Sequence, residues 1–406
     1  MEMLEHGSVT TPDGFTTGVA TCGLKESGRP DLMLLHSERD CTAAGMFTRN
    51  QVVGATVTLN RETLAANSDR MRAIATNSGI ANVCTGATGL QNARHMQSLA
   101  ATAMRCRIEQ VLVLSTGIIG VQLPMDKIRA GLTAAAADQH PDGGMAAARA
   151  IMTTDTRPKH LAAQIQLPTG SVTIGAIVKG SGMIHPKMAT MLAILTTDAL
   201  IPARTLRALL IPAVNHSFNC ISIDGDTSTS DAVLLLANGA TGISCARGEA
   251  REAFAAALTH LATELAHLVV RDGEGVTKFV SIRVSGARTK ADAHRVANTI
   301  ATSPLVKTAF AGSDPNWGRI IAASGRAGVR FDLQRAALWI GASDHETLQL
   351  VARGTPCDYK ESDAAQIFAG SDFSVHLDLG CGDAETTVWT GDLTHEYVSI
   401  NADYRT

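Results

Sequence analysis

The sequence predicts a mixed α/β (α+β) fold with a smaller C-terminal α+β lobe, and three observations lead to this class. Through about residue 125, short apolar runs alternate with glycine-containing turns, a pattern that is typical of strands. Between residues 249 and 270, apolar side chains instead recur at steps of three and four, which is the period of a helix. Strand-like runs return after residue 329 and indicate a second, smaller lobe.

The composition favours a globular protein without nucleic-acid or membrane partners. The chain has 406 residues, of which 45% are hydrophobic and 18% charged, so it can bury a sizeable core and form two domains, or one large domain with an appendage. A net charge of −3 and an aromatic content of 4% argue against a surface for nucleic acid or anionic lipid. No apolar run suggests a membrane span and the first residues lack a signal-peptide pattern, so we expect a cytoplasmic protein.

The spacing of cysteine and histidine gives no indication of a metal site. The eight cysteines form no C-x-x-C pair and no zinc spacing with histidine. The 13 histidines include no H-E-x-x-H motif. We therefore expect no metal cofactor, and thiols that are reduced and mostly buried.

The first part of the chain is expected to contain strands, one helix and a hairpin. Strand-like runs cover residues 32–37, 43–59 and 71–82, and a helix is expected at residues 89–103. The run Val111–Leu114 predicts a fully buried strand that ends at Thr116 and Gly117. The polar segment 153–159 is interpreted as a solvated loop, and Pro168-Thr169-Gly170 predicts a hairpin turn.

The stretch Lys179–Asp198 combines flexible and buried features. Gly180 and Gly182 loosen its backbone, and the apolar run after Thr190 predicts a buried strand. A cut between Ala189 and Thr190 would place a free α-amine beside the threonine hydroxyl, and an amine with a pKa of about 8 can act as its base. A threonine before a strand is also ordinary β-propensity, so these residues alone leave both interpretations open.

The second half is expected to alternate helices and strands. Pro212 should kink or end a helix that begins near residue 202. The acid-rich segment 217–231 lacks the glycine and glutamate positions of an EF-hand, which favours a structural loop over a calcium site. Asp314 and Pro315 are expected as the N-cap and first residue of a helix. Further elements are expected at residues 280–288, 292–301, 337–342 and 373–380.

Several of these segments resemble, in the same order, the ornithine acetyltransferase (glutamate N-acetyltransferase, ArgJ) family. KGSGMIHPKMATML, at residues 179–192, is very similar to the family's processing site, and residues 217–231 match the family nearly residue for residue. The resemblance extends from the N-terminal GFTTG to Thr406. It implies a layered ArgJ/aminopeptidase-like fold, with sheets and helices sandwiched, whose precursor cuts itself between Ala189 and Thr190.

The resemblance also implies the residues of the site. Residues 115–120, STGIIG, match a family motif in which the Thr-Gly pair forms the oxyanion hole, so that role comes to Thr116 and Gly117. Thr190 is the implied nucleophile and new N-terminus. The implied substrate-binding residues are Thr154, Lys179, Thr190, Glu274, Asn401 and Thr406. We expect an ion pair between Lys179 and Glu274, which suits a zwitterionic amino acid.

The function that the resemblance implies belongs to arginine biosynthesis. The acetyl group of N2-acetylornithine would pass to the threonine and then to glutamate, in a ping-pong reaction that gives ornithine and N-acetylglutamate. No cofactor is implied, and the sequence leaves open whether acetyl-CoA is a second donor. Two alternatives remain: a self-processing amidase or aminopeptidase of the same fold, and a binding protein that has lost processing.

The expected organisation follows from the cut. Residues 1–189 would form an alpha chain and residues 190–406 a beta chain, which associate as a heterotetramer of two alpha and two beta chains. Within the beta chain, residues 190–285 would complete the main catalytic domain, and residues 286–406 would form the smaller lobe.

Overall fold

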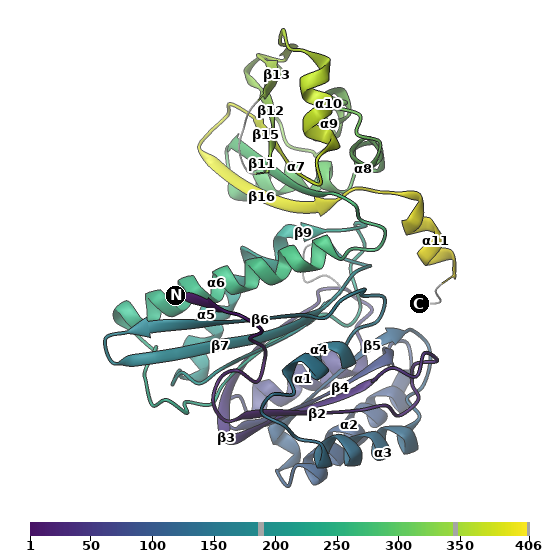
Figure 1. Cartoon of the computed structure of the whole chain (residues 1–406), viewed down its shortest axis with the longest axis vertical. Coiled ribbons are helices and arrows are strands. Elements are labelled where there is room, and N and C mark those ends of the chain that lie inside the picture. The colour runs from purple at the N-terminus through teal and green to yellow at the C-terminus, as the bar shows by residue number, and fades with distance from the viewer. Residues whose placement is uncertain (186–190, 344–347, 404–406) are drawn as a thin grey trace.

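Two mixed β-sheets organise the computed structural model, which describes residues 1–185, 191–343 and 348–403 (Figure 1). Nine described strands form the first sheet in the order β1-β6-β7-β8-β10-β3-β4-β5, with β2 paired to β3. Seven described strands form the second, in the order β14-β13-β12-β15-β11-β16-β9. The mixed α/β class is confirmed. Of the residues assigned to the site from sequence, Ala189, Thr190 and Thr406 lie outside the described residues.

The strands of the first sheet come from both halves of the sequence. Their bounds are β1 Glu2–Leu4, β2 Phe15–Ala20, β3 Leu32–Phe47, β4 Met71–Ile80, β5 Val111–Ile118, β6 Lys159–Leu167, β7 Gly170–Lys179, β8 Leu192–Thr197 and β10 Ala232–Ala237.

Strand β3 is long enough to serve two parts of this sheet. Its residues 32–36 pair with β2 and β4, and its residues 42–47 pair with β10. The register is irregular between His36 and Cys41, where the strand changes partners. The two parts enclose one core, because side chains of β3–β5 and of β7, β8 and β10 belong to the same buried cluster.

The alternation of side chains along the strands divides the body into layers. On β10, Val233 packs in a cluster with two helices on one face, whereas Leu234 belongs to the cluster between the two parts of the sheet. On β5, Leu112 belongs to that same inner cluster, and Val113 packs toward helices on the opposite face. The body therefore has four layers, with helices outside and strands inside.

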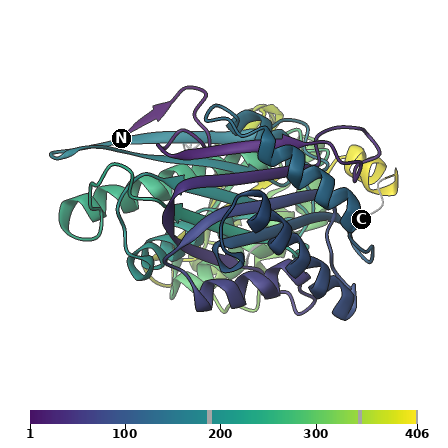
Figure 2. The ribbon, with the colours of Figure 1, turned by 90° about the horizontal axis from the view of Figure 1, so that it is seen from below.

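Six helices accompany the first sheet in the described part of the chain. α1 Ala55–Ala66, α2 Gly86–Ala103 and α3 Met125–Ala137 cover β3–β5, and Figure 2 shows these purple and blue helices crossing the near face. α5 Ala203–Asn215 and α6 Gly248–Arg271 cover the other face, and the short α4 Gly144–Ala150 packs in the inner core.

Helix α6 is the one described helix that is long and apolar enough to cross a membrane, a property that the sequence analysis did not count. Its best window has a mean hydropathy of 1.4, and half of that window is buried inside the protein. Phe254, Leu258, Leu261 and Leu265 lie in the cluster that the helix shares with the sheet. The leucine stripe predicted from the sequence is therefore a core face.

The second sheet and four helices form the smaller lobe, at the top of Figure 1. The strands are β9 Ile221–Ser222, β11 Phe279–Ala287, β12 Ala337–Ala342, β13 Leu348–Ala352, β14 Thr355–Pro356, β15 Asp372–Asp378 and β16 Ala384–Gly391. The helices are α7 Lys290–Ala301, α8 Pro304–Ala311, α9 Trp317–Gly325 and α10 Glu361–Ala369. β11 spans the boundary expected between residues 285 and 286.

The last described helix, α11 His395–Asp403, leaves the smaller lobe and returns toward the main body (Figure 1). The Thr394 hydroxyl donates to the Gly275 carbonyl oxygen at 2.7 Å and fixes the start of this return. A chain end would ordinarily fray. Here it is held against the turn that follows α6.

Local patterns predicted some elements correctly and others wrongly. The buried strand at Val111–Leu114 and the hairpin between β6 and β7 are confirmed. Residues 55–59, expected as strand, instead begin α1, in which the Asn60 side-chain amide donates to the Val113 carbonyl and accepts from the Val113 N–H. This contact with β5 is long-range, so packing overrides the β-propensity of the segment.

Of the two outcomes expected at Pro212, a kink or an end of the helix, the structure excludes the end, and the N-cap expected at Asp314 is wrong. Pro212 lies inside α5, which continues to Asn215, because the His216 N–H still donates to the Pro212 carbonyl and completes the last turn. Helix α9 begins at Trp317, and its N-cap is Asn316, whose side chain accepts from the Arg319 N–H at 3.3 Å. Asp314 and Pro315 therefore precede the cap.

Candidate active site

Six of the residues predicted from sequence line one pocket of about 250 Å³, where strands of the first sheet end near the base of the smaller lobe. They are Thr116, Gly117, Thr154, Lys179, Glu274 and Asn401. They come from β5, the loop after α4, β7, the turn after α6, and α11. The fold thus brings together side chains that are widely separated in the sequence.

Thr116 and Gly117 lie where β5 meets an irregular register with β4. Gly117 has a φ of +127°, and a Cβ placed there would lie 2.3 Å from the Gly79 carbonyl carbon. Only glycine fits this close approach of the two strands. The neighbouring Thr116 hydroxyl is buried and accepts a hydrogen bond from Lys179 Nζ at 3.4 Å. The turn is therefore fixed in place and polar.

Lys179 is buried at the end of β7, and burial lowers the pKa of its ammonium group. The carboxylates of Asp155 and Glu274 act in the opposite direction and favour the charged form. The expected ion pair between Lys179 and Glu274 is wrong, since no such contact within 4 Å occurs in the described structure. Both side chains nevertheless line the pocket.

Segment 153–159 is largely a loop, as expected, but it is not solvated throughout: Thr156 and Arg157 are exposed, whereas Asp155 and Lys159 are buried. Asp155 and Lys159 are 3% and 1% exposed, and Lys159 Nζ donates to Asp155 Oδ1 at 2.6 Å. The same ammonium lies 2.5 Å from Asp272 Oδ2 at the end of α6. Burial alone would raise the pKa of the Asp155 carboxyl, but Lys159 and Lys179 outweigh it and hold that pKa well below its ordinary value.

This buried ion network fixes the backbone on two sides of the pocket. Asp155 accepts from the Gly180 N–H at 2.8 Å and from the Thr153 N–H at 2.9 Å. The hydroxyls of Thr154 and Ser181 are hydrogen-bonded at 2.6 Å. The loop after α4 and the segment after β7 are consequently held together. No sequence motif indicated Asp155 and Lys159.

Glu274 faces the pocket across from this network. Its backbone N–H donates to the Ser181 carbonyl at 2.8 Å, and its Oε2 accepts from Asn401 Nδ2 at 2.8 Å. A Cβ at Gly182 would lie 2.5 Å from the Glu274 carboxyl group, so the glycine permits this approach. The described end of the chain therefore contacts the site directly through Asn401.

Two aspartates hold the chain on either side of residues 186–190. On the N-terminal side, Asp224 accepts from the Met183 N–H at 2.6 Å and from the Ile184 N–H at 2.9 Å. On the C-terminal side, Asp231 accepts from the Met191 N–H at 3.0 Å. Both come from the acid-rich segment 217–231, and these contacts support its assignment as a structural loop. Sequence reasoning missed the role of both residues.

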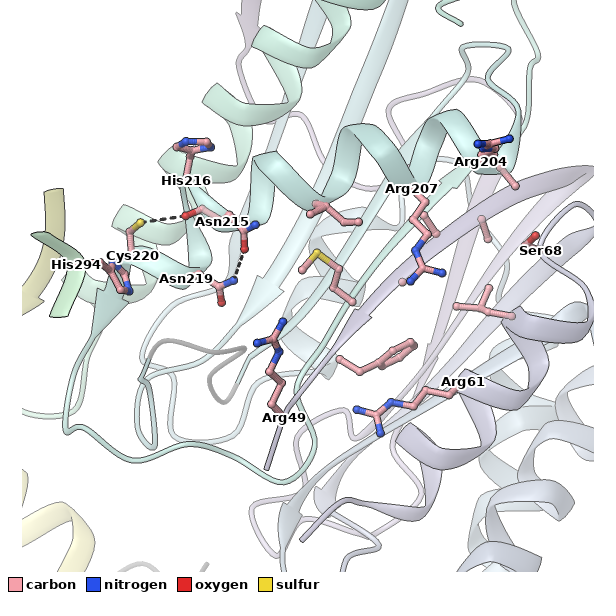
Figure 3. Close-up of a pocket in the computed structure, with 18 of the residues that line it drawn as sticks. Arg49, Arg61, Ser68, Arg204, Arg207, Asn215, His216, Asn219, Cys220 and His294 are labelled. Atoms are coloured by element: carbon pink, nitrogen blue, oxygen red, sulfur yellow. Dashed lines mark hydrogen bonds between the residues drawn. The ribbon is translucent and has the colours of Figure 1, made fainter. Parts of the chain in front are cut away.

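A much larger groove, of about 1740 Å³, lies elsewhere on the molecule, between β3, α5 and the smaller lobe. Figure 3 shows Arg49, Arg61, Arg204 and Arg207 around it. None of the site residues predicted from sequence lines this groove. Its basic rim is wide and open, whereas the smaller pocket has converging groups of both charges. The smaller pocket is therefore the candidate active site.

Within residues 1–185, 191–343 and 348–403, no group of three or more histidine, cysteine or acidic side chains is arranged to hold a metal ion. The pocket is lined instead by one buried ammonium, three acidic side chains and several hydroxyls. Such a set binds a charged amino acid well, because a zwitterion presents one group of each sign.

Comparison with known proteins gives consistent matches along the whole chain. The model described as "ArgJ family" matches residues 16–406. "Arginine biosynthesis bifunctional protein ArgJ" of Symbiobacterium thermophilum is 47% identical, over 98% of this chain and 99% of that protein. The mitochondrial protein of that name from Heterostelium pallidum is 42% identical, over 97% and 94%.

A solved structure is also similar to part of the chain. It is the ornithine acetyltransferase of Mycobacterium tuberculosis in complex with ornithine, which is 37% identical. The match covers 45% of this chain and 97% of that one, with a TM-score of 0.42.

Proposed function

The chain belongs to the ArgJ family, and on that premise we propose that Thr190 carries an acetyl group from N2-acetylornithine to glutamate. The enzyme is an acyltransferase of arginine biosynthesis. The observation that supports the site is the convergence of Thr116, Lys179 and Glu274 on one pocket. Ser230 also lines it, and the next residue, Asp231, accepts a hydrogen bond from the N–H of Met191, which follows Thr190.

The reaction begins with self-cleavage. Thr190 Oγ attacks the carbonyl carbon of Ala189, the Ala189–Thr190 C–N bond breaks, and the nitrogen gains a proton. Water then hydrolyses the ester, which frees the hydroxyl and leaves a carboxylate on Ala189. The products are an alpha chain, residues 1–189, and a beta chain, residues 190–406, with an α-amine on Thr190 that can accept the hydroxyl proton.

Acetyl transfer uses the same groups twice. The Thr190 amine takes the hydroxyl proton while Oγ attacks the acetyl carbon of acetylornithine, and that proton passes to the departing ornithine nitrogen. Glutamate then enters, its α-amine attacks the acetyl ester, and N-acetylglutamate leaves. Each tetrahedral intermediate carries an oxyanion, which Thr116 and Gly117 stabilise. One such donor contributes about 3–4 kcal/mol to lowering the barrier.

The charged walls of the pocket hold the amino acids. Lys179 supplies the cation for a substrate carboxylate, and Glu274 supplies the anion for an ammonium group. Thr154 and Asn401 add neutral hydrogen-bonding groups, and Thr406 completes the set from the C-terminus. A lysine whose pKa is lowered by burial still binds a carboxylate when the substrate brings the counter-charge with it.

The bifunctional ArgJ enzymes to which this chain is related suggest a second donor. In this proposal acetyl-CoA acetylates Thr190 in place of acetylornithine, and glutamate receives the group as before. No resident cofactor is needed, because the acetyl carrier is the threonine itself. The fragments stay associated as a heterotetramer of two alpha and two beta chains, in the cytoplasm.

The test separates processing from transfer. Purified wild-type protein should run as two fragments whose second N-terminus is Thr190, and Thr190→Ala should remain full length and inactive. N-terminal sequencing that finds another start would refute the assigned nucleophile. Consumption of acetylornithine should depend on glutamate; equal consumption without glutamate would favour the amidase alternative.

A further inference from the structure

Asp231 is a buried carboxyl group with one oxygen unused. It stands immediately before β10 and is 0% exposed. Its Oδ1 accepts from the Met191 N–H at 3.0 Å. Its Oδ2 is also buried and has no hydrogen-bond partner among the described residues. A buried oxygen without a partner is unfavourable, so the position calls for a functional reason.

Covalent geometry places the carboxyl near the bond that is cut. The nitrogen of residue 190 is joined to the Met191 nitrogen through three bonds, which limits their separation to about 3.7 Å in any conformation. The Met191 nitrogen is hydrogen-bonded to Asp231, so this side chain holds the residue that directly follows Thr190, next in sequence to the bond proposed to be cut.

The surroundings favour the protonated acid. Burial raises the pKa of the Asp231 carboxyl well above its ordinary value, and Lys179 only partly offsets this. The remaining charges belong to other contacts: Lys179 lies among Asp155, Lys159 and Glu274, and Arg61 donates to the Thr48 carbonyl, next to which Asp231 packs. The Ser228 and Thr48 hydroxyls also act to lower that pKa, but neither supplies a counter-charge, and the Thr48 hydroxyl donates to the Ser228 carbonyl at 2.6 Å.

Asp224, which precedes Asp231 in the same acid-rich segment, differs from it in the number of hydrogen bonds that its carboxyl group accepts. Its two oxygens accept from three backbone N–H groups, those of Met183, Ile184 and Asp226, and from the Tyr397 hydroxyl. That carboxylate is saturated and serves as an anchor. Asp231 has a free oxygen and is the carboxyl group available for proton transfer.

We propose that Asp231 donates a proton to the nitrogen of residue 190 as the Ala189–Thr190 bond breaks, and afterwards accepts a hydrogen bond from the α-amine. The inference rests on the self-cleavage proposed above. As Oγ forms its bond to the Ala189 carbonyl carbon, the hydroxyl proton passes to water and the Asp231 proton passes to the departing nitrogen. The products are an ester, an amine and the Asp231 carboxylate, with one proton released to solvent.

Asp231→Asn keeps the shape and the acceptor for Met191, but it cannot transfer a proton. Full-length protein is synthesised by cell-free translation, synthesis is stopped, and the protein is transferred to buffers from pH 5 to 9. The fraction cleaved is then followed over time on gels. Since general acid catalysis contributes about 10²–10⁴-fold, the variant should cleave at least 100-fold more slowly. The wild-type cleavage rate should fall as pH rises through the pKa of Asp231. The cleavage rate of Asp231→Asn should not show this decrease.

The matched control is Asp198→Asn. Asp198 also accepts from backbone N–H groups, those of Thr173 and Asp13, but it follows the far end of β8. The Asp198→Asn variant should therefore cleave itself at the wild-type rate. Hydroxylamine gives a second readout, because it cleaves esters: it should leave Asp231→Asn uncut, since the block precedes the ester. Acceleration by hydroxylamine would place the defect at ester hydrolysis and overturn the inference.

The outcomes distinguish this inference from the function on which it depends. If wild-type protein is not cut before Thr190, the proposed function fails. If wild type is cut there and Asp231→Asn is cut equally fast, only the role of Asp231 fails. If Asp231→Asn does not melt cooperatively, the comparison uses Asp231→Glu and wild type, because both keep a carboxyl group that can transfer a proton. A cleavage rate that is independent of pH in either protein would overturn the proposed role of Asp231.

Discussion

Lys159→Met should destabilise the protein strongly, although the substitution preserves an unbranched chain of similar length. Lys159 is 1% exposed and lies 2.6 Å from Asp155 Oδ1 and 2.5 Å from Asp272 Oδ2. Its removal leaves two buried carboxylates without their common cation. Breaking a buried pair from one side costs about 3–5 kcal/mol. With an unfolding entropy of about 2.1 cal/mol/K per residue, a chain of 406 residues shifts by about 1.2 °C per kcal/mol, so the melting temperature should fall by roughly 4–6 °C.

The pH dependence of this effect has a definite sign. The pKa of Asp155 is held below its ordinary value in the folded protein, so its contribution to stability is complete above about pH 4. It is lost as the pH falls through the folded pKa. The difference in the free energy of unfolding between wild type and Lys159→Met should therefore be widest near pH 7 and should narrow below pH 4.

Urea and thermal unfolding, followed by circular dichroism, measure this difference. Both proteins should carry Thr190→Ala, which keeps a single chain. Glu385→Gln is the control, because the Arg283–Glu385 pair is equally short at 2.7 Å but about half exposed. Its loss should cost no more than about 1 kcal/mol. If Lys159→Met costs no more than this control, the network does not stabilise the fold as argued.

Two further predictions concern catalysis. Thr116→Ala should lower kcat by about 10²–10³-fold with little change in KM, because an oxyanion donor acts on the transition state; a loss confined to KM would mean that the turn only shapes the pocket. Deletion of residues 401–406 removes the Asn401 contact with Glu274 and should sharply reduce glutamate-dependent consumption of acetylornithine while sparing self-cleavage. An unchanged glutamate-dependent rate would show that the tail takes no part in transfer.

Elements fixed by local chemistry were predictable from the sequence. The turn Pro168-Thr169-Gly170 joins β6 and β7 as expected, and the leucine stripe of α6 faces the core. Helix α1 was not predictable, because the Asn60 contact with Val113 that holds it depends on a strand some fifty residues later. Propensity alone favoured a strand there.

The site residues also fall into two groups, those that the sequence indicated and those that it did not. Thr116, Lys179 and Glu274 were found through resemblance to family motifs, and they do line one pocket. Asp155 and Lys159 were interpreted as solvated, because nothing local showed that Asp272, more than a hundred residues later, would bury and neutralise them. Long-range charge compensation leaves no local pattern in a single sequence.

The order of strands in the first sheet has a consequence for the mature protein. β8 and β10, from residues after the proposed cut, lie between β7 and β3, from residues before it. Neither fragment can leave without opening the middle of the sheet. Refolding after denaturation then requires an encounter of two molecules, which becomes slower on dilution. The lifetime of the cleaved enzyme would then depend on its rate of unfolding. Folding would be unimolecular only before cleavage, while the protein is still a single chain.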